Sequence, residues 1–471
     1  MLRKEPLIVR IGQSIDDSPA EDALAEGAGR NPAEYVKGVE ACPWVKEDSD
    51  PRTESLLERV VDADNMHLAW KQVRRNKGAP GIDGRTIEET KAFLRTGWPD
   101  IRERLLEGTY KPQPVLRVEI PKPGGGVRKL GIPTVVDRLI QQAISQVLLP
   151  IFDPTFSESS FGFRPGRRAH DAVRQAHRYQ QEGRQWVVDL DLKQFFDEVD
   201  HDVLMARLGR KVKDKRLKRL INAYLKAGVM VGDHREPTEK GTPQGGPLSP
   251  LLSNILLDDL DKELERRGHR FCRYADDVNI YVRSQRAGDR AMRSLTRYVE
   301  TNLNLKVNRD KSAVARPWKR SFLGFTFRKI WGKMIISIAD KSWKRFRLQA
   351  KDLFRPGRGQ NLGRFIRETL NPFLRGWMQY FRLGASKQQV TSHDFWIRRH
   401  LRCLIWRQWK RPDTRFDQLR NRGCPKDRAL LAYTRRGPWW CSGTPALKQT
   451  LDPPYFQQHG LYNLLDVYGA T

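Results

Sequence analysis

Apolar and polar residues alternate along the chain with a period that changes from block to block. From about Leu56 the apolar positions recur with helical spacing in LLERVVDADNMHLAWKQVRRN, and the turn-forming stretch KGAPGIDG ends this block. A second helical pattern covers Trp98 to Gly108. The period then falls to two in VLRVEIPKPGGGVRKLGIPT, which predicts a β-hairpin with a Gly-rich turn.

The same mixture of periods continues to about residue 340. Helical spacing returns over residues 137–150, 170–183 and 287–303, and strand-like runs appear in QWVVDLDL, FCRYADDVNI, RSFLGFTF and KMIISI. Hairpins interleaved with helices are typical of an antiparallel sheet backed by helices. We therefore predict an α+β fold for this part of the chain.

The composition changes after Asp340. Residues 341–411 contain 18 Lys or Arg and only three acidic residues. In WIRRHLRCLIWRQWK the apolar side chains Ile397, Leu401, Leu404 and Ile405 share one helical stripe, and the arginines lie off it. This pattern predicts a basic helical domain, followed by a Pro- and Gly-punctuated aromatic segment over 413–471 whose fold the pattern does not indicate.

The first 50 residues differ from the rest in charge and composition. They hold six Lys or Arg and eleven Asp or Glu, and they are short of large apolar residues. We expect 1–50 to be an acidic, flexible extension. The length of 471 residues favours about three further domains, which we place at 51–330, 331–412 and 413–471.

The net charge of +30 points to a polyanionic partner, and nucleic acid is the first candidate. No apolar run is long enough to span a bilayer and no secretion signal begins the chain, so we expect a cytoplasmic protein without a membrane partner. The five cysteines form no CxxC pair, which argues against a zinc finger or a disulfide framework.

Two adjacent acids stand at the tip of the hairpin FCRYADDVNI. Burying Asp276 and Asp277 unpaired would cost several kcal/mol apiece, so the pair calls for a cation. Hard divalent ions such as Mg²⁺ take carboxylate oxygens and leave room for substrate phosphates. The strand VVDLDL offers a third acid, but Asp189 and Asp191 point the same way, and spacing alone does not choose between them.

The order of these segments resembles the palm of reverse transcriptases. In that family the first acid is followed five residues later by an aromatic residue, and Asp191 with Phe196 fits, whereas Asp189 is followed by Gln194. The resemblance implies a right-hand polymerase in which Asp191, Asp276 and Asp277 are the catalytic and metal-binding residues. They would hold two Mg²⁺ ions while deoxynucleoside triphosphates are joined to a primer.

Seven blocks in order narrow the resemblance to the group II intron reverse transcriptases, or maturases. They are KGAPGIDG, EIPKPGGGVRKLGIPTVVDRLIQQAI, SSFGFRPGRRAHDAV, TPQGGPLSPLLSNILLDDLD, RYADD, LKVNRDKS and SFLGF. The resemblance implies that 51–330 forms fingers and palm, that 331–412 forms the helical thumb called domain X, and that 413–471 is a small DNA-binding region.

The family resemblance also implies nucleotide-binding and RNA-binding residues. Phe196 would exclude a ribose 2′-OH, and Gln244 would lie beside the templating base pair. Lys122 and Arg128 would clamp the triphosphate, and Lys311 would protonate or neutralise pyrophosphate, although a structural salt bridge is equally compatible with the sequence. The RNA-binding candidates are Arg164, Arg167, Arg398, Arg399 and Arg402.

The chain departs from many relatives at its C-terminal side, where no paired cysteines and no His-rich cluster follow the thumb. We therefore expect no endonuclease, as in the compact class C intron proteins. The implied partners are group II intron RNA, an RNA template with a DNA primer, and target DNA, with a monomer and a dimer both left open. Two alternatives remain: a splicing-only maturase, and a related reverse transcriptase domesticated for DNA repair or defence.

Overall fold

The computed structural model describes residues 55–121, 126–232 and 234–468. These residues fall into two compact units, and the boundary between them along the chain follows Ser342. The acidic extension predicted for 1–50 lies outside the described residues. In the described part of the chain, none of the helices combines the length and the apolar character that crossing a membrane requires.

The first unit is built around a four-stranded sheet in the order β6-β7-β3-β8, with all neighbours antiparallel. Its strands are β3 (Trp186–Leu190), β6 (Arg270–Tyr274), β7 (Asp277–Val282) and β8 (Ala313–Ala315). Their alternating apolar residues, among them Val188, Val278 and Ile280, are fully buried. The predicted antiparallel sheet and α+β class are confirmed.

Helices cover this sheet and join it to the rest of the unit. α5 (Ala169–Gln181) packs on β6, and α10 (Gln285–Asn302) packs on β3 and β8. One apolar core continues from the sheet through α9 (Ser249–Arg266) to α4 (Val135–Phe152). The sheet edge that carries the candidate acids is therefore anchored on a rigid interior.

The first unit also contains a second sheet, whose strands follow the order β2-β1-β4-β5. It contains β1 (Val115–Pro121), β2 (Val127–Ile132), β4 (Val229–Val231) and β5 (His234–Glu236), so the predicted hairpin is present. The remaining helices of the unit are α1 (Leu56–Val60), α2 (Ala63–Arg75), α3 (Ile87–Glu107), α6 (Phe195–Glu198), α7 (His201–Gly209) and α8 (Lys215–Leu225).

Two sequence predictions of helices need correction. The single helix expected from Leu56 is two helices, because the Asp62 carboxylate accepts hydrogen bonds from the backbone N–H groups of Asp64 and Asn65 and so starts a new helix. The helix predicted from Trp98 instead begins eleven residues earlier, where Thr86 and Glu89 form a capping box.

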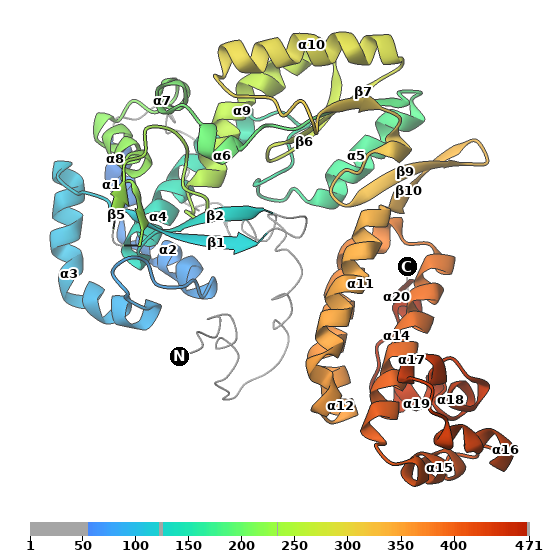
Figure 1. The fold of residues 1–471 in the computed structure, drawn as a ribbon. Helices are drawn as coiled ribbons and strands as arrows, with labels where there is room; N and C mark the ends of the chain where they lie inside the picture. Colours follow the sequence, from blue (N-terminus) through green and yellow to red (C-terminus); the bar gives the residue numbers. More distant parts are fainter. Residues whose placement is uncertain (1–54, 122–125, 233, 469–471) are drawn as a thin grey trace. The chain divides into compact units, whose positions relative to one another are not determined.

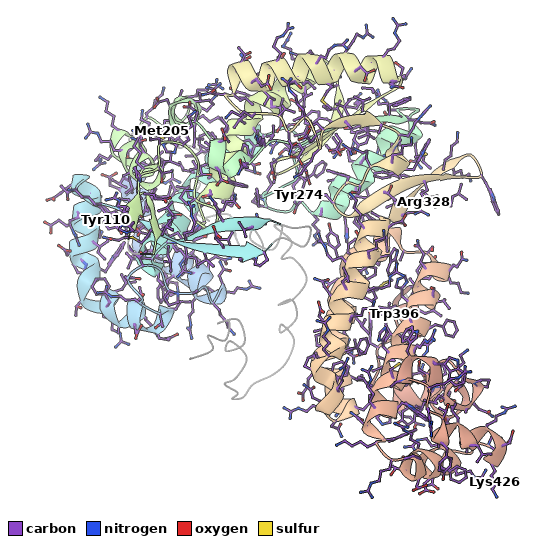
Figure 2. All side chains as sticks on the ribbon, in the orientation of Figure 1. Tyr110, Met205, Tyr274, Arg328, Trp396 and Lys426 are labelled. Atoms are coloured by element: carbon purple, nitrogen blue, oxygen red, sulfur yellow. The ribbon has the colours of Figure 1, made fainter. Side chains whose placement is uncertain are left out.

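The last two strands of the first unit form a β-hairpin. β9 (Phe325–Ile330) and β10 (Lys333–Ile338) pair antiparallel, and Arg328 on β9 is labelled in Figure 2. The predicted boundary at residue 330 falls inside this hairpin, yet both of its strands belong to the first unit.

The second unit is helical. Its elements are α11 (Asp340–Phe354), α12 (Leu362–Phe365), α13 (Asn371–Phe381), α14 (Lys387–Gln408), α15 (Pro412–Arg420), α16 (Lys426–Ala429), α17 (Pro438–Cys441), α18 (Pro445–Thr450), α19 (Pro453–Gln458) and α20 (Leu464–Tyr468). Aromatic rings fill its centre: the Trp343 ring lies 3.8 Å from His393 and 4.4 Å from Trp377, centroid to centroid.

The long helix α14 runs through the middle of this unit, and Figure 2 labels Trp396 on it. The predicted apolar stripe, Ile397, Leu401, Leu404 and Ile405, is buried, as expected. In the segment 413–471, whose fold the sequence did not indicate, the helices α17 and α20 pack against α14.

Candidate active site

The two adjacent acids occupy a tight turn between β6 and β7. Tyr274 pairs with Asp277, so Ala275 and Asp276 form the turn itself. Ala275 has a φ of 55°, a left-handed conformation that costs a non-glycine residue roughly 1–2 kcal/mol. The surrounding chain must therefore hold this turn in place.

A neighbouring loop is pressed against the turn. A Cβ atom added to Gly162 would lie 2.2 Å from the Ala275 backbone nitrogen, so only glycine permits this approach. The Phe161 N–H donates to the Arg273 carbonyl at 2.9 Å. The loop SSFGFRPGRR therefore braces the hairpin that carries the acids.

The third candidate, Asp191, arrives from the neighbouring strand. β3 and β7 pair with Asp189 opposite Asn279 and Leu190 opposite Val278, so Asp191 follows the end of β3 on the side where β7 begins at Asp277. The Asp191 N–H donates to Ser312 Oγ at 3.0 Å, and its carbonyl accepts from the Asn308 N–H at 2.8 Å. Both backbone groups of Asp191 are thus fixed by the segment before β8.

The close approach of these carboxylates is visible in their electrostatics. Burial, followed by the charges of Asp276, Asp189 and Asp191, raises the pKa of Asp277 to about 7, although its side chain keeps a face open to solvent. Burial also raises the pKa of Asp276, with a further contribution from Asp191. Among the described residues, Arg128 and Lys311 oppose these pKa rises but do not cancel them.

Asp189 and Asp191 differ in what they contact. Asp189 forms an ion pair with Arg320, whose Nε lies 3.0 Å from Asp189 Oδ2. Asp191 forms no ion pair with any residue that the structure describes. This contrast leaves Asp191 available to a cation and supports the choice that the resemblance made.

The donor set fits a hard cation that completes its shell from elsewhere. Across the described parts of the chain, no group of three or more His, Cys, Asp or Glu side chains is placed so as to hold a metal ion. Mg²⁺ in proteins is usually held by one or two carboxylates together with water and substrate phosphates. Asp276 and Asp277 in the turn, with Asp191 on the adjacent segment, would supply carboxylate oxygens of this kind, and water and substrate phosphates would have to complete the coordination.

A pocket of about 260 Å³ brings two of the predicted nucleotide-binding residues together. Phe196, on α6, and Gln244, in the QGGPLSP loop, both line it. Arg128 Nε donates to Gln244 Oε1 at 3.1 Å, and the Arg128 charge opposes the pKa rise of Asp276. The fingers hairpin, the loop and the acid turn are therefore neighbours in space.

The glycines of the QGGPLSP loop make this approach possible. Gly245 has a φ of 128°, and a Cβ there would lie 2.6 Å from the Gly131 carbonyl oxygen. The Gly131 N–H in turn donates to the Gln244 carbonyl at 2.8 Å. Any side chain at residue 245 would push Gln244 away from the fingers strand β2.

Two predicted nucleotide-binding lysines remain. Lys122 lies outside the described residues. Lys311 is exposed, and its charge lowers the pKa of Asp277, against the larger effects that raise it. Lys311 thus lies close enough to act on the acid cluster.

The RNA-binding candidates of the FRPGR loop are engaged within the protein. Arg164 is buried, and its guanidinium donates to the Asp153 carboxylate and to the carbonyls of Asp153, Ser157 and Ser160. This geometry argues against the predicted RNA contact, because no donor faces solvent. Arg167 is half-buried and pairs with Glu158.

The candidates on α14 need a similar correction. Arg398 and Arg402 are buried, and Arg402 donates to the carbonyls of Ser442 and Leu451. Burial lowers the pKa of Arg402 to about 10. Arg399 alone of the three is half-exposed, with its guanidinium carbon 4.0 Å from the Trp439 ring centroid.

Sequence reasoning missed a buried network behind the acid turn. Arg273 and Asp261 are fully buried and paired, and Arg273 also donates to Asn254 Oδ1 at 2.9 Å, Ser160 Oγ at 2.7 Å and the Ala275 carbonyl at 3.0 Å. The available signal was an arginine in FCRYADD between two apolar residues of a buried strand. Burying such a charge requires a partner.

Comparison with known proteins defines the class. Residues 120–327 match the family model for reverse transcriptase (RNA-dependent DNA polymerase), and residues 343–423 match the group II intron, maturase-specific domain. The chain is thus an RNA-directed DNA polymerase by class. It belongs to the group II intron reverse transcriptase and maturase family.

Similar proteins come from bacteria, fungi and plants. Protein YkfC of Escherichia coli is 34% identical over 313 residues, which cover 58% of this chain and 82% of that protein. The group II intron-encoded protein LtrA of Lactococcus lactis is 38% identical over 218 residues, 46% of this chain but only 36% of LtrA. Nuclear intron maturase 2 of Arabidopsis thaliana is 29% identical over 35% of this chain and 28% of that protein.

A solved partial Cas6-RT-Cas1–Cas2 complex is also similar. It shares 24% identity and a TM-score of 0.35 over 53% of this chain and 43% of the matched one, which adds nothing to the family assignment. Reverse transcriptase domains generally use divalent metal ions, and the maturase domain indicates nucleic-acid partners.

Proposed function

We propose that this chain copies group II intron RNA into DNA and binds the intron RNA to assist its splicing. The observation that carries the proposal is the convergence of Asp191, Asp276 and Asp277 at one sheet edge, with the pKa of Asp277 raised to about 7. Positive charge bound beside Asp277 would favour its charged form.

The three acids would hold two Mg²⁺ ions. Bound there, the ions would activate the primer 3′-hydroxyl and stabilise the leaving pyrophosphate. The contribution of the chain is to fix the carboxylates: Ser312 and Asn308 hold the backbone of Asp191, and Gly162 and Arg273 hold the turn at Ala275.

We assign the selection of the incoming nucleotide to the pocket that Phe196 and Gln244 line. Phe196 would exclude a 2′-hydroxyl sterically, and Gln244 would contact the templating pair. Arg128, hydrogen-bonded to Gln244, would bind the triphosphate with Lys122 from the same hairpin. Lys311 would meet the leaving pyrophosphate.

The second unit would bind the template–primer and the intron RNA through its excess of positive charge. We further propose that the protein acts in the bacterial cytosol during retrohoming, in the manner of the class C proteins that lack an endonuclease. Residues 413–471 would contact the target DNA.

Primer extension on an RNA template with dNTPs and Mg²⁺ tests the proposal through two matched variants. Asp191→Asn removes a proposed metal ligand and should abolish extension. Asp189→Asn removes a carboxylate from the same strand face that is already paired with Arg320, and it should retain most activity. Equal activity of the two variants would reject the metal assignment.

The wild-type protein decides between the remaining alternatives. Splicing promoted without any primer extension would favour the splicing-only maturase. Extension without specific binding of an intron RNA would favour a domesticated enzyme of repair or defence.

A further inference from the structure

Two adjacent tryptophans lie partly in solvent on the second unit. Trp439 and Trp440 belong to the short helix α17, and each is 45% exposed. Pro438 occupies the first turn of this helix, which fixes the backbone that carries both rings. Large aromatic side chains exposed side by side are uncommon on a soluble surface and call for an explanation.

Each ring has an arginine on one face. The guanidinium carbon of Arg399 lies 4.0 Å from the Trp439 ring centroid, and that of Arg436 lies 4.2 Å from the Trp440 ring centroid. Both distances are within the range of cation–π attraction. Each ring therefore contacts a guanidinium while 45% of the residue stays exposed to solvent.

The support behind Trp439 is rigid. Arg399 donates to the Trp439 carbonyl at 3.1 Å and to Ser442 Oγ at 3.4 Å, and the His400 ring lies 4.9 Å from the Trp439 ring. A Cβ on Gly443 would come within 3.2 Å of the Arg399 guanidinium. The ring is thus held before any ligand arrives, which lowers the entropic cost of binding.

The surroundings are strongly positive. The charges that act on His400, beside Trp439, are those of Lys351, Arg399 and Arg407. Arg435 and Arg436, which precede α17, are both exposed. An apolar protein partner would have to bury these charges without compensation, which is costly, whereas a phosphate backbone would compensate them.

We propose that Trp439 and Trp440, with Arg435 and Arg436, form a stacking platform for an unpaired strand of nucleic acid. Two bases would stack on the exposed parts of the indoles, and the arginines would pair with the phosphates between them. The platform rests on the proposed function in taking nucleic acid as the ligand, and it adds a binding site on the second unit.

Binding of fluorescein-labelled dT and U oligonucleotides to the full chain, followed by anisotropy, tests the platform. Trp439→Leu and Trp440→Leu should each weaken binding roughly tenfold, and the Phe variants should recover part of the loss, since a phenyl ring still stacks. Arg435→Ala/Arg436→Ala should flatten the dependence of the dissociation constant on salt concentration.

Tyr433→Ala is the matched control. Tyr433 is 52% exposed in the same unit, but its hydroxyl donates to Asp413. The negative charge of this carboxylate should repel a phosphate group. Oligonucleotide binding should remain at the wild-type level in this variant. Thermal unfolding of every variant, with a midpoint close to that of the wild type, verifies that the unit is folded.

The outcomes separate this inference from the proposed function. If the Leu variants lose the same affinity for dT and U oligonucleotides, the platform does not distinguish deoxyribose from ribose. If the affinity for one of the two falls more, the bound strand is assigned to DNA or to RNA accordingly. Wild-type affinity in both Leu variants, or equal losses for Leu and Phe, overturns the platform. Because anisotropy requires no polymerisation, an inactive polymerase would reject the proposed function and leave this result standing.

Discussion

The buried pair of Arg273 and Asp261 offers the sharpest test of how the fold positions the acid turn. Both side chains are 0% exposed, and their closest atoms are 2.5 Å apart. Arg273→Met removes the positive partner and leaves a carboxylate in the core. Breaking a buried ion pair in this way costs about 3–5 kcal/mol, a large share of the roughly 5–15 kcal/mol that stabilises a domain.

A second variant separates stability from positioning. In Arg273→Met/Asp261→Leu no buried charge remains, and replacing a buried pair by apolar residues is often neutral. In urea unfolding, we expect this double variant to regain at least half of the free energy of unfolding that Arg273→Met loses. Primer extension should stay low, because the Ala275 carbonyl has lost the donor that lies 3.0 Å away and the left-handed turn is less well held.

Two results would refute this reasoning. One is a free energy of unfolding for Arg273→Met that lies within about 1 kcal/mol of the wild-type value. The ion pair would then contribute much less to stability than a buried pair should. If the double variant extends primers at the wild-type rate, Arg273 stabilises the fold but does not position the turn.

Three further perturbations probe other parts of the chain. Gly162→Ala should lower primer extension by roughly a hundredfold in rate assays, because the new Cβ would collide with the Ala275 backbone. Asp137→Leu should cost about 2–3 kcal/mol in urea unfolding, since the hydroxyls of Tyr110, Tyr224 and Thr134 all donate to that buried carboxylate. Burial lowers the pKa of His400 from 6.5 to about 4, so the stability that its neutral ring contributes is complete above pH 6.5 and is lost as the pH falls towards 4. Thermal midpoints between pH 7.5 and 4.5 should therefore fall more steeply for the wild type than for His400→Phe.

Local patterns predicted the acid hairpin well because its signals are local. Alternation in FCRYADDVNI gives the strands, and two adjacent acids at the turn indicate the chemistry. The choice between Asp189 and Asp191 depends on Arg320, more than a hundred residues downstream. No spacing rule within the strand contains that information, and only the family resemblance supplied it.

The arginines of α14 show the opposite failure. Arginine is almost never fully buried, so Arg398 and Arg402 were expected to face a ligand. Their environment comes from the segment after residue 413, where carbonyls of Ser442 and Leu451 accept from Arg402. Because the fold of that segment was not predictable, neither was the burial of these side chains.

The way Asp191 is held also sets an order of events during synthesis of the chain. Its backbone partners, Ser312 and Asn308, and the strand β8 that pairs with β3 lie more than a hundred residues later. A ribosome that has delivered both other acids has still not delivered the groups that lock the first one. If the three acids act as proposed, the nascent chain should therefore stay inactive until the segment through β8 has left the exit tunnel.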